Sequence, residues 1–396
     1  MTERLYYKDP GLLEFNASIV DAGDADGRHW TVLDKSAFYP TSGGQLFDIG
    51  LLNGIPVVDV VETDEGEVRH LTVSPVGMTR EKVTGVVDGP RRHMHRQQHT
   101  AQHIISQAFI EKFDLETVSV HLGEEYGAVE LNTEQVTDSQ LAVVLDRCRE
   151  VIFDNHPVQI LFITLEEARK LPLRKVPDRS GTIRVIKTGE FDYSACGGTH
   201  CDTTAQVGTL EFAGIEKMRG RVLVRFLAGE QLRQDYLRRR RVTDSLTGYF
   251  TCHVDDLPAK TRRLDEENKE LRRETARLQK EMIPTLAADL ASNVTTIEKK
   301  QFVFAALENY DPKLAGQLAA AIARKVRGIA AVTSLDRIAI AVEPDSGLHA
   351  GNIVKALTER TGARGGGNPT QAQAGGLDPT QLSVYRETLE RIIRGL

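Results

Sequence analysis

Two short segments of the chain carry side chains of the types that bind metal ions. His99 and His103 stand four residues apart in the first segment, and Cys196 and His200 stand four residues apart in the second. On a helix, this spacing places both side chains on one face, one turn apart. Imidazole and thiolate ligands favour Zn²⁺ over Mg²⁺ or Ca²⁺, which prefer oxygen. Together the four residues predict a zinc site.

The first pair is expected on a helix. No Pro or Gly interrupts residues 91–113, and Pro90 suits the first turn. An apolar stripe at helical spacing runs beside the histidines. A histidine pair on a helix is more often a solvated face or part of a core, so the helix alone is weak evidence for a metal. The second pair supplies the stronger signal.

That second pair is expected on a loop. Gly197 and Gly198 separate its two ligands, and glycines let the backbone turn sharply and approach a bound group closely. A loop carrying Cys and His commonly completes a zinc site. His95 and Cys201 are rival ligands because they lie close to the chosen residues, and we rank both below them.

Both motifs resemble those of a known family. Residues 99–103 (HTAQH) and 196–200 (CGGTH) resemble the zinc motifs of the alanyl-tRNA editing proteins, the AlaX group, and of the editing domain in alanyl-tRNA synthetase. Residues 38–45 (FYPTSGGQ) are similar to the glycine-rich editing loop of that family. Residues 365–367 and 371–376 are similar to the signature of the synthetase C-terminal domain. The resemblance covers nearly the whole chain, and the long AlaX form matches best.

The resemblance implies a freestanding trans-editing hydrolase. Its expected substrate is tRNA(Ala) that carries a wrong amino acid, mainly Ser-tRNA(Ala), and Gly-tRNA(Ala) is left open. The expected reaction is hydrolysis of the ester that joins the amino acid to the terminal ribose, which makes the protein an aminoacyl-tRNA deacylase. The metal is expected to be Zn²⁺. The loop residues expected to contact the aminoacyl end are Thr41, Ser42, Gly43, Gly44 and Gln45.

Without the resemblance, this loop would be read as a plain glycine turn. With it, we expect Gln45, Thr41 and Ser42 to be catalytic or substrate-binding residues. The hydroxyl of Thr41 or Ser42 could form a hydrogen bond with the hydroxyl of a bound serine and would lose this partner when alanine binds. Such a loss separates serine from alanine better than their difference in size does. Two features depart from the usual family pattern and leave the fine specificity open: Thr41 and Ser42 before the two glycines of the loop, and Gln102 between the two histidines.

The role of the zinc is also open. A zinc ion with an exchangeable position activates water or polarises a carbonyl. Four protein ligands, in contrast, are typical of a closed structural site. We therefore expect the zinc mainly to order the cleft, with the attacking water held by nearby polar groups such as Gln45.

The sequence pattern predicts an α+β fold with several parts. In residues 1–90, short β runs separated by Gly, Asp and Asn turns predict a small β-barrel that carries the glycine-rich loop. Residues 91–229 predict a zinc-binding α+β editing domain. After the zinc helix, this domain should contain strands within 116–131, an amphipathic helix at 139–155 and a hairpin at 207–228.

Residues 230–285 predict a helical hairpin or coiled coil that ends at Pro284. The seven-residue leucine repeat favours a parallel homodimer, whereas the family resemblance favours an antiparallel hairpin, and both can coexist. The leucines of the repeat are Leu257, Leu264, Leu271 and Leu278. The densest basic cluster precedes them and is read either as a phosphate contact for tRNA or as a solvated helix face: Arg238, Arg239, Arg240 and Arg241.

Residues 286–396 predict a C-terminal α/β domain of alternating strands and helices. The glycine run at 362–368 is expected to be flexible backbone that either cradles a phosphate or simply links two elements. Similarity to the synthetase C-terminal domain implies tRNA binding by Gly365, Gly366 and Gly367, and self-association. A homodimer through this domain or the coiled coil is therefore expected.

Composition sets further limits. The 396 residues predict two or three domains, and the contents of 40% hydrophobic and 27% charged residues are ordinary for a globular protein. Four Cys do not make a disulfide framework, and no apolar run approaches the ~20 residues needed to span a bilayer. We expect a cytoplasmic protein without a membrane partner. The net charge of −6 means that tRNA binding must rely on local basic patches.

Other classes of function were weighed. A full alanyl-tRNA synthetase is not expected, because the chain starts directly with the β region and leaves no room for an aminoacylation domain. A tRNA-binding module with a purely structural zinc would bind tRNA without turnover. A zinc hydrolase for small substrates would have no obvious use for the C-terminal half.

Overall fold

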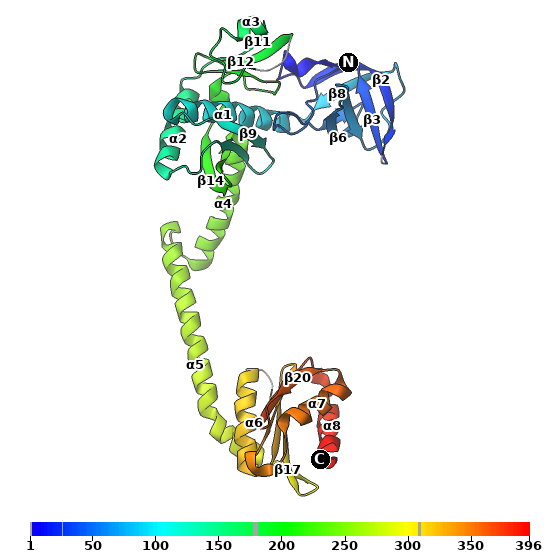
Figure 1. The fold of residues 1–396 in the computed structure, drawn as a ribbon, viewed down its shortest axis with the longest axis vertical. Helices are drawn as coiled ribbons and strands as arrows, with labels where there is room; N and C mark the ends of the chain where they lie inside the picture. The colour runs from blue at the N-terminus through cyan, green and yellow to red at the C-terminus, as the bar shows by residue number, and fades with distance from the viewer. Residues whose placement is uncertain (1, 26, 177–180, 308–309) are drawn as a thin grey trace. The chain divides into compact units, whose positions relative to one another are not determined.

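The computed structural model describes the chain except for residues 1, 26, 177–180 and 308–309 (Figure 1). The chain packs as two compact units, Met1–Leu246 and Thr247–Leu396, and each is described by itself. Both contain helices and strands, so the predicted α+β class is confirmed. Among the described residues, no helix combines the length and the apolar character that crossing a membrane requires.

A closed six-stranded barrel forms the first part of unit 1, as the turn-rich β pattern predicted. Every neighbouring pair of strands is antiparallel. Two short parallel strands, β1 (Glu3–Arg4) and β4 (Lys35–Ser36), lie outside the barrel order. Side chains such as Leu33, Leu52 and Val60 fill the interior. Around the barrel, the strands follow the order β2 (Glu14–Ala25), β3 (Arg28–Leu33), β7 (Val68–Thr72), β6 (Ile55–Glu62), β5 (Gly50–Leu52) and β8 (Lys82–Val87).

The predicted metal-site helix is α1 (Gly89–Phe113). Asp88 caps it by accepting a hydrogen bond from the backbone N–H of Arg91, and Pro90 occupies the first turn. Asp114, in the left-handed conformation with φ 54°, ends it. Most of the helix is buried, because the barrel loop and two sheets surround it.

Two antiparallel sheets complete unit 1. One has the strand order β14 (Leu210–Met218), β15 (Arg221–Ala228), β10 (Gly127–Leu131) and β9 (Thr117–Leu122). Helices α1 and α2 (Asp138–Phe153) pack on it around one apolar core, and Thr137 with Gln140 forms a capping box at the start of α2. The other sheet consists of β11 (Val158–Thr164), β12 (Thr182–Thr188) and β13 (Asp192–Ala195), with the short helix α3 (Leu165–Ala168) beside it.

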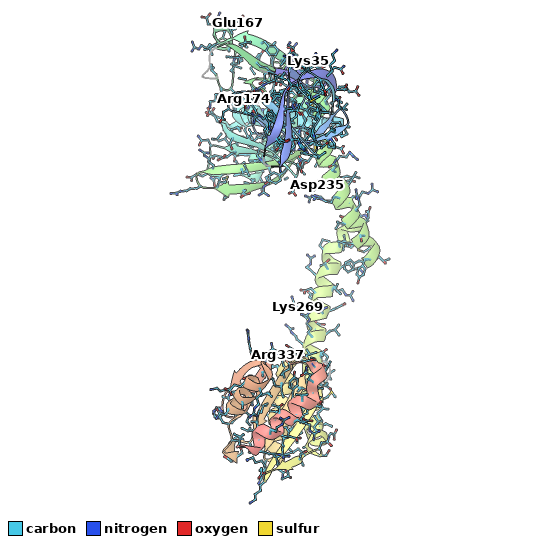
Figure 2. The ribbon with its side chains drawn as sticks, turned by 90° about the vertical axis from the view of Figure 1, so that its right-hand side faces the viewer. Lys35, Glu167, Arg174, Asp235, Lys269 and Arg337 are labelled. Atoms are coloured by element: carbon cyan, nitrogen blue, oxygen red, sulfur yellow. The ribbon has the colours of Figure 1, made fainter. Side chains whose placement is uncertain are left out.

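Helix α4 (Gly229–Phe250) carries the arginine cluster. All four arginines are exposed. Arg238 and Arg239 form ion pairs with Asp235 one turn earlier on the same helix, where Figure 2 shows this carboxylate, and Arg240 pairs with Asp244. Part of the positive charge is therefore balanced within the helix.

The expectation that Pro284 ends the next helix is wrong. Helix α5 (Leu257–Ala291) continues through Pro284. A proline inside a helix costs about 3 kcal/mol. Burial of the following turn offsets this cost, since Ala287 is 3% exposed and Leu286 and Leu290 pack on the core of unit 2. In this chain the repeat residues Leu264, Leu271 and Leu278 are exposed, so the coiled coil stays a prediction.

Unit 2 is built on a six-stranded sheet between helices. Its order is β16 (Thr295–Ile297), β17 (Lys300–Leu307), β18 (Ile329–Ser334), β19 (Arg337–Val342), β21 (Gln371–Gly375) and β20 (Arg364–Gly367). Alternate residues of the central strands face opposite cores. One core contains α6 (Pro312–Val326) and the end of α5, and the other contains α7 (Ala350–Thr361) and α8 (Leu382–Arg394).

The glycine run of unit 2 is an edge strand and not the flexible loop expected from its sequence. β20 pairs with β21 through Gly365, Gly366 and Gly367. A Cβ at Gly365 would lie 2.2 Å from the carbonyl oxygen of Gln373, and a Cβ at Gly367 would lie 2.3 Å from that of Gln371. The glycines therefore permit a close approach of two strands.

Candidate metal centre

The fold brings the four predicted metal ligands together. The ligand atoms of His99, His103, Cys196 and His200 all lie within 4.8 Å of one another. The Sγ of Cys196 lies 3.3 Å from Nε2 of His99 and 3.4 Å from Nε2 of His200. Strand β13 ends at Ala195, so the sheet places the Cys-Gly-Gly-Thr-His loop directly against α1. The rivals His95 and Cys201 are not members of this group.

The second ring nitrogen of each histidine is held by another side chain. This arrangement fixes the ring and leaves Nε2 for a metal ion, as is usual at metal sites. The three contacts join His99 Nδ1 to Gln45 Oε1 at 2.8 Å, His103 Nδ1 to Asp192 Oδ2 at 3.1 Å, and His200 Nδ1 to Thr100 Oγ1 at 3.3 Å.

The pKa shifts of Cys196 and His200 suit metal binding, whereas that of His103 has the opposite direction. Burial alone lowers the pKa of His103, but its hydrogen bonds with Asp192 and Cys196 raise it above its ordinary value. Burial by itself raises the pKa of the Cys196 thiol, but the adjacent His99 and His200 and hydrogen bonds from the imidazoles lower this pKa well below its ordinary value. Burial, together with neighbouring His99 and His103, lowers the pKa of His200 well below its ordinary value. Thiolate and neutral imidazole are the forms that bind metals. Three imidazole nitrogens and one thiolate fit Zn²⁺.

Asp192 connects the metal centre to the cavity wall. Its side chain is buried, and Oδ1 accepts a hydrogen bond from Arg174 Nε at 2.7 Å. Burial alone raises the pKa of Asp192, but Arg174 and the hydrogen bond from His103 bring it below its ordinary value. Asp192 therefore holds His103 as a carboxylate. Arg174, labelled in Figure 2, also donates to Ser194 Oγ at 2.6 Å and is fixed in turn.

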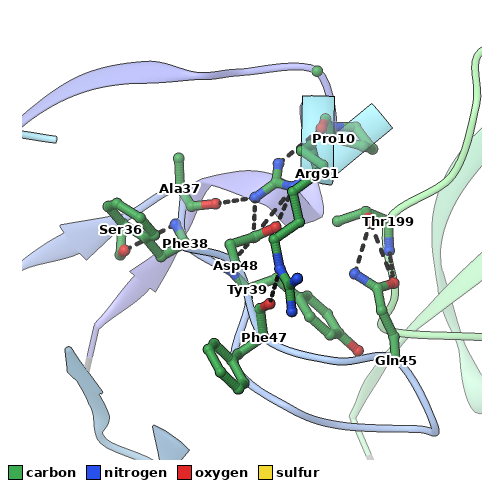
Figure 3. Close-up of polar contacts among 12 residues, drawn as sticks. Pro10, Ser36, Ala37, Phe38, Tyr39, Gln45, Phe47, Asp48, Arg91 and Thr199 are labelled. Carbon is green, nitrogen blue, oxygen red and sulfur yellow. Dashed lines mark hydrogen bonds and ion pairs between the residues drawn. The ribbon is translucent and has the colours of Figure 1, made fainter. Parts of the chain in front are cut away.

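Gln45 is buried, and its amide is engaged on both sides. Oε1 accepts hydrogen bonds from His99 Nδ1 and, at 3.1 Å, from the backbone N–H of Thr199. Nε2 donates to Thr199 Oγ1 at 2.9 Å (Figure 3). Gln45 thus links the glycine-rich loop to both halves of the metal group. These contacts favour a role in holding His99 over the expected role in holding water.

The glycine-rich loop turns tightly between Ser42 and Gln45, whose backbones bond each other in both directions. Gly43 and Gly44 have φ of 55° and 84°, in the left-handed region that favours glycine. A Cβ at Gly44 would also lie 2.5 Å from the carbonyl oxygen of Val120. The hydroxyl of Thr41 accepts a hydrogen bond from the backbone N–H of Phe47 at 3.2 Å.

One cavity of about 630 Å³ joins the loop to the metal group. Ser42 and Gly43 line one side, and His99, His103 and Cys196 line another. The remaining wall includes the polar or charged side chains of Gln102, Glu116, Arg174 and Lys175. The sequence expectation that the metal ligands and the loop face a common cleft is therefore met by this geometry.

A buried ion pair fixes the end of the loop against α1. Arg92 and Asp48 have side chains that are each 1% exposed. Arg92 donates to both carboxylate oxygens of Asp48 and to the carbonyl oxygens of Pro10 and Ala37. Asp48 Oδ2 also accepts from the backbone N–H of Tyr39 at 2.7 Å (Figure 3). The pair thus ties Asp48, at the end of the loop, to α1 and to the backbones of Pro10, Ala37 and Tyr39.

The remaining predicted residues lie outside the metal group. The four arginines are on α4, and Gly365 to Gly367 are on β20 in unit 2. Their contacts with tRNA stay predictions. Sequence reasoning missed Asp192, Arg174 and Thr199. The general pairing of metal-bound histidines with carboxylates was the one available signal, and it did not single out Asp192 among many acidic residues.

Gly198 allows His99 to reach the metal group. A Cβ at this position would lie 2.0 Å from Cε1 of His99, whereas a Cβ at Gly197 would come no closer than 3.4 Å to any atom, its nearest neighbour being the hydroxyl of Tyr7. We expect Gly198→Ala to displace His99 and to weaken Zn²⁺ affinity by about 10- to 100-fold, as for loss of a group that orients a ligand. Gly197→Ala should bind zinc like the wild type. Competition with a zinc chelator measures both, and equal affinities of the two variants would contradict the geometry.

Family comparisons place these features in known domains. Residues 183–223, which include Cys196 and His200, match the model "Threonyl and Alanyl tRNA synthetase second additional domain". Residues 299–395 match the DHHA1 domain. The two matched segments lie in different units of the structure.

Curated relatives extend the match along the chain. The alanyl-tRNA editing protein AlaX-L of Pyrococcus horikoshii is 36% identical over 219 residues, which are 53% of this chain and 54% of that protein. The alanine-tRNA ligase of Pyrococcus abyssi is 27% identical over 408 residues, 99% of this chain and 43% of the ligase. The chain thus spans about half the length of these relatives. It is a homologue of AlaX-L and of alanine-tRNA ligases, as its motifs predicted.

Among solved structures, the C-Ala domain of the Aquifex aeolicus alanyl-tRNA synthetase aligns with 26% of this chain and 99% of that domain. The sequence identity is 19% and the TM-score is 0.25.

Proposed function

We propose that the chain is a freestanding trans-editing deacylase, a cytoplasmic enzyme that hydrolyses Ser-tRNA(Ala), with Gly-tRNA(Ala) as an open second substrate. The observation that carries this proposal is the single cavity lined by the metal group and by the glycine-rich loop. The homologue AlaX-L is named an alanyl-tRNA editing protein, which supports tRNA(Ala) as the substrate.

Ester hydrolysis needs a placed carbonyl, a placed water and stabilisation of the charge that develops on the carbonyl oxygen. We assign His99, His103, Cys196 and His200 to Zn²⁺. When bound, Zn²⁺ acts as a Lewis acid that polarises an oxygen ligand and stabilises negative charge. Gln45 and Asp192 hold the histidine rings from behind, so the ligands keep their positions when the substrate enters.

The glycine-rich loop is assigned to the aminoacyl end of the tRNA. Ser42 and Gly43 line the cavity, and the lack of a side chain at Gly43 lets the substrate approach the backbone. Gln45 acts by fixing this loop and His99 relative to each other. Four protein ligands saturate a tetrahedral zinc ion, so we assign the metal mainly to ordering and positioning within the cavity.

Ser42 is the better candidate for reading the serine side chain. Ser42 lines the cavity, whereas Thr41 is not among its lining residues and the hydroxyl of Thr41 already accepts from the backbone N–H of Phe47. We expect Ser42→Ala to lower the ratio of kcat/KM for seryl- over alanyl-tRNA(Ala) by about 3- to 10-fold, the worth of one neutral hydrogen bond. Thr41→Val should change this ratio less. Steady-state deacylation of both esters measures it, and a loss confined to Thr41→Val would reverse the assignment.

The helical segment and the C-terminal domain are assigned to tRNA capture. We propose four functional parts: the barrel at 1–90, the zinc-binding editing domain at 91–229, the helical segment at 230–285 and a tRNA-binding, dimerising domain at 286–396. The arginines of α4 and Gly365 to Gly367 would contact tRNA, and the exposed leucines of α5 support a homodimer.

Deacylation of tRNA(Ala) charged with labelled serine tests the proposed function. Metal-replete protein should release serine and spare alanine. Tight tRNA binding without release of serine would instead favour the alternative, a tRNA-binding module whose zinc only stabilises the fold.

A further inference from the structure

One polar side chain of the cavity has no role in the chemistry described so far. Gln102 lies on α1 next to the ligand His103 and one turn from His99. It is 4% exposed, and it lines the same cavity as these two histidines. A nearly buried amide in such a place needs partners for both its nitrogen and its oxygen.

The Gln102 amide is held by Ser106, which Thr117 contacts in turn. Nε2 donates to Ser106 Oγ at 2.8 Å, and Thr117 Oγ1 donates to the same Ser106 Oγ at 2.8 Å. This contact engages Nε2 and leaves Oε1 as the amide atom that is available to a molecule in the cavity. Within the part of the chain that the structure describes, Oε1 has no hydrogen-bond partner. The cavity thus contains an oriented acceptor beside the metal group.

The group that best suits this acceptor is a cation with N–H donors. Hydrogen bonds to charged donors are roughly twice as strong as neutral ones, so an ammonium group gains more than a hydroxyl. The charges of the cavity wall allow it, since Arg174 is paired with Asp192 and the rest of the lining includes one carboxylate, Glu116, as well as one further cation, Lys175. On an aminoacyl ester, the ammonium group is the α-amino group.

We propose that Oε1 of Gln102 binds the α-ammonium group of the amino acid carried by the tRNA. This inference rests on the proposed function and adds a second element of selection. Gln102 would recognise the feature that all aminoacyl esters share, whereas Ser42 would read the side chain. The cavity should therefore prefer an α-amino ester over the corresponding α-hydroxy ester.

The test compares two esters that differ at one group. tRNA(Ala) is acylated with serine or with glyceric acid, in which a hydroxyl replaces the α-amino group. The wild type should hydrolyse the seryl ester faster than the glyceroyl ester, the ester of glyceric acid, after the rate of spontaneous hydrolysis is subtracted from each. In Gln102→Met, of similar volume, this ratio of kcat/KM should fall by about 10- to 100-fold, the range for a charge-assisted hydrogen bond. Zinc content should remain that of the wild type.

One further variant sharpens the result. Ser106→Ala removes the partner that orients the amide, so the amino-over-hydroxy ratio should fall in the same direction but less. If Gln102→Met does not fold, Ser106→Ala alone decides, and an unchanged ratio then counts against the inference. If folded Gln102→Met keeps the amino-over-hydroxy ratio of the wild type, the inference is overturned. The same holds if the substitution lowers the seryl-over-alanyl ratio and leaves the amino-over-hydroxy ratio unchanged.

A binding measurement separates failure of this inference from failure of the proposed function. The binding probes are 3′-(serylamino)-3′-deoxyadenosine and its glyceroyl counterpart, in which an amide replaces the ester, so neither can be hydrolysed as an ester. If the wild type releases no serine, the proposed function fails, but a preference for the seryl amide that Gln102→Met abolishes would still support the ammonium site. Equal binding of the two amides by the wild type would overturn it.

Discussion

Replacing Cys196 by alanine is expected to remove bound zinc and, with it, deacylation. Cys196 is the only thiolate of the group, and the site was assigned to Zn²⁺ because a thiolate joins three imidazoles. Loss of a residue that only orients a ligand costs 10- to 100-fold in metal affinity, so loss of a ligand should cost more than about 100-fold. Zinc content per chain after dialysis measures the effect, and His103→Ala should behave alike.

The chain offers a matched control for this experiment. Cys201 lies five residues later and is 2% exposed, and burial raises the pKa of its thiol to about 11, so it remains a neutral thiol. Cys201→Ala should therefore keep its zinc. Full zinc content in Cys196→Ala, or loss of zinc in Cys201→Ala, would show that the ligands are assigned wrongly.

Replacing Arg92 by alanine is expected to lower the free energy of unfolding of unit 1 by about 3–5 kcal/mol, the cost of leaving a buried charge without its partner. The substitution leaves the Asp48 carboxylate buried at 1% exposure, with the backbone N–H of Tyr39 as a remaining donor. It also leaves the carbonyl oxygens of Pro10 and Ala37 without their donor. Because these groups position the loop end, deacylation should fall as well.

Chemical denaturation followed by a probe in unit 1 measures this change. The exposed pair Arg149 and Glu211, with side chains 45% and 48% exposed, provides the comparison. Arg149→Ala should cost no more than about 1 kcal/mol, since exposed ion pairs contribute little. If Arg92→Ala cost as little as Arg149→Ala, the proposed anchoring of the loop by a buried ion pair would be wrong.

The elements that local signals specify could be predicted from the sequence. Short β runs at regular spacing between Gly, Asp and Asn turns predicted a barrel, and Pro90 with the uninterrupted stretch after it predicted α1. The grouping of the four candidate metal ligands followed from residue type and spacing, because a helix turn and a glycine loop each bring two of them together. A prediction of this kind needs only short-range geometry.

Features that depend on long-range packing could not be predicted. Pro284 stays inside α5 because the turn that follows it is buried against unit 2, and a local rule does not include that burial. The glycine run reads as a loop unless its pairing with β21 is known. Likewise, Asp192 supports His103 across 89 residues, and Arg92 reaches Asp48 across 44. The same limit applies to Gln102, whose free oxygen is evident only once the cavity is in view.

The most direct test of the account is the deacylation of tRNA(Ala) charged with labelled serine or labelled alanine. Equal amounts of metal-replete wild type and of a His99→Ala His103→Ala variant would be compared at one salt concentration, with tRNA binding measured in parallel. The account predicts rapid release of serine by the wild type, sparing of alanine, and loss of release in the variant while tRNA binding persists. No release of serine by the wild type despite tight tRNA binding would contradict it.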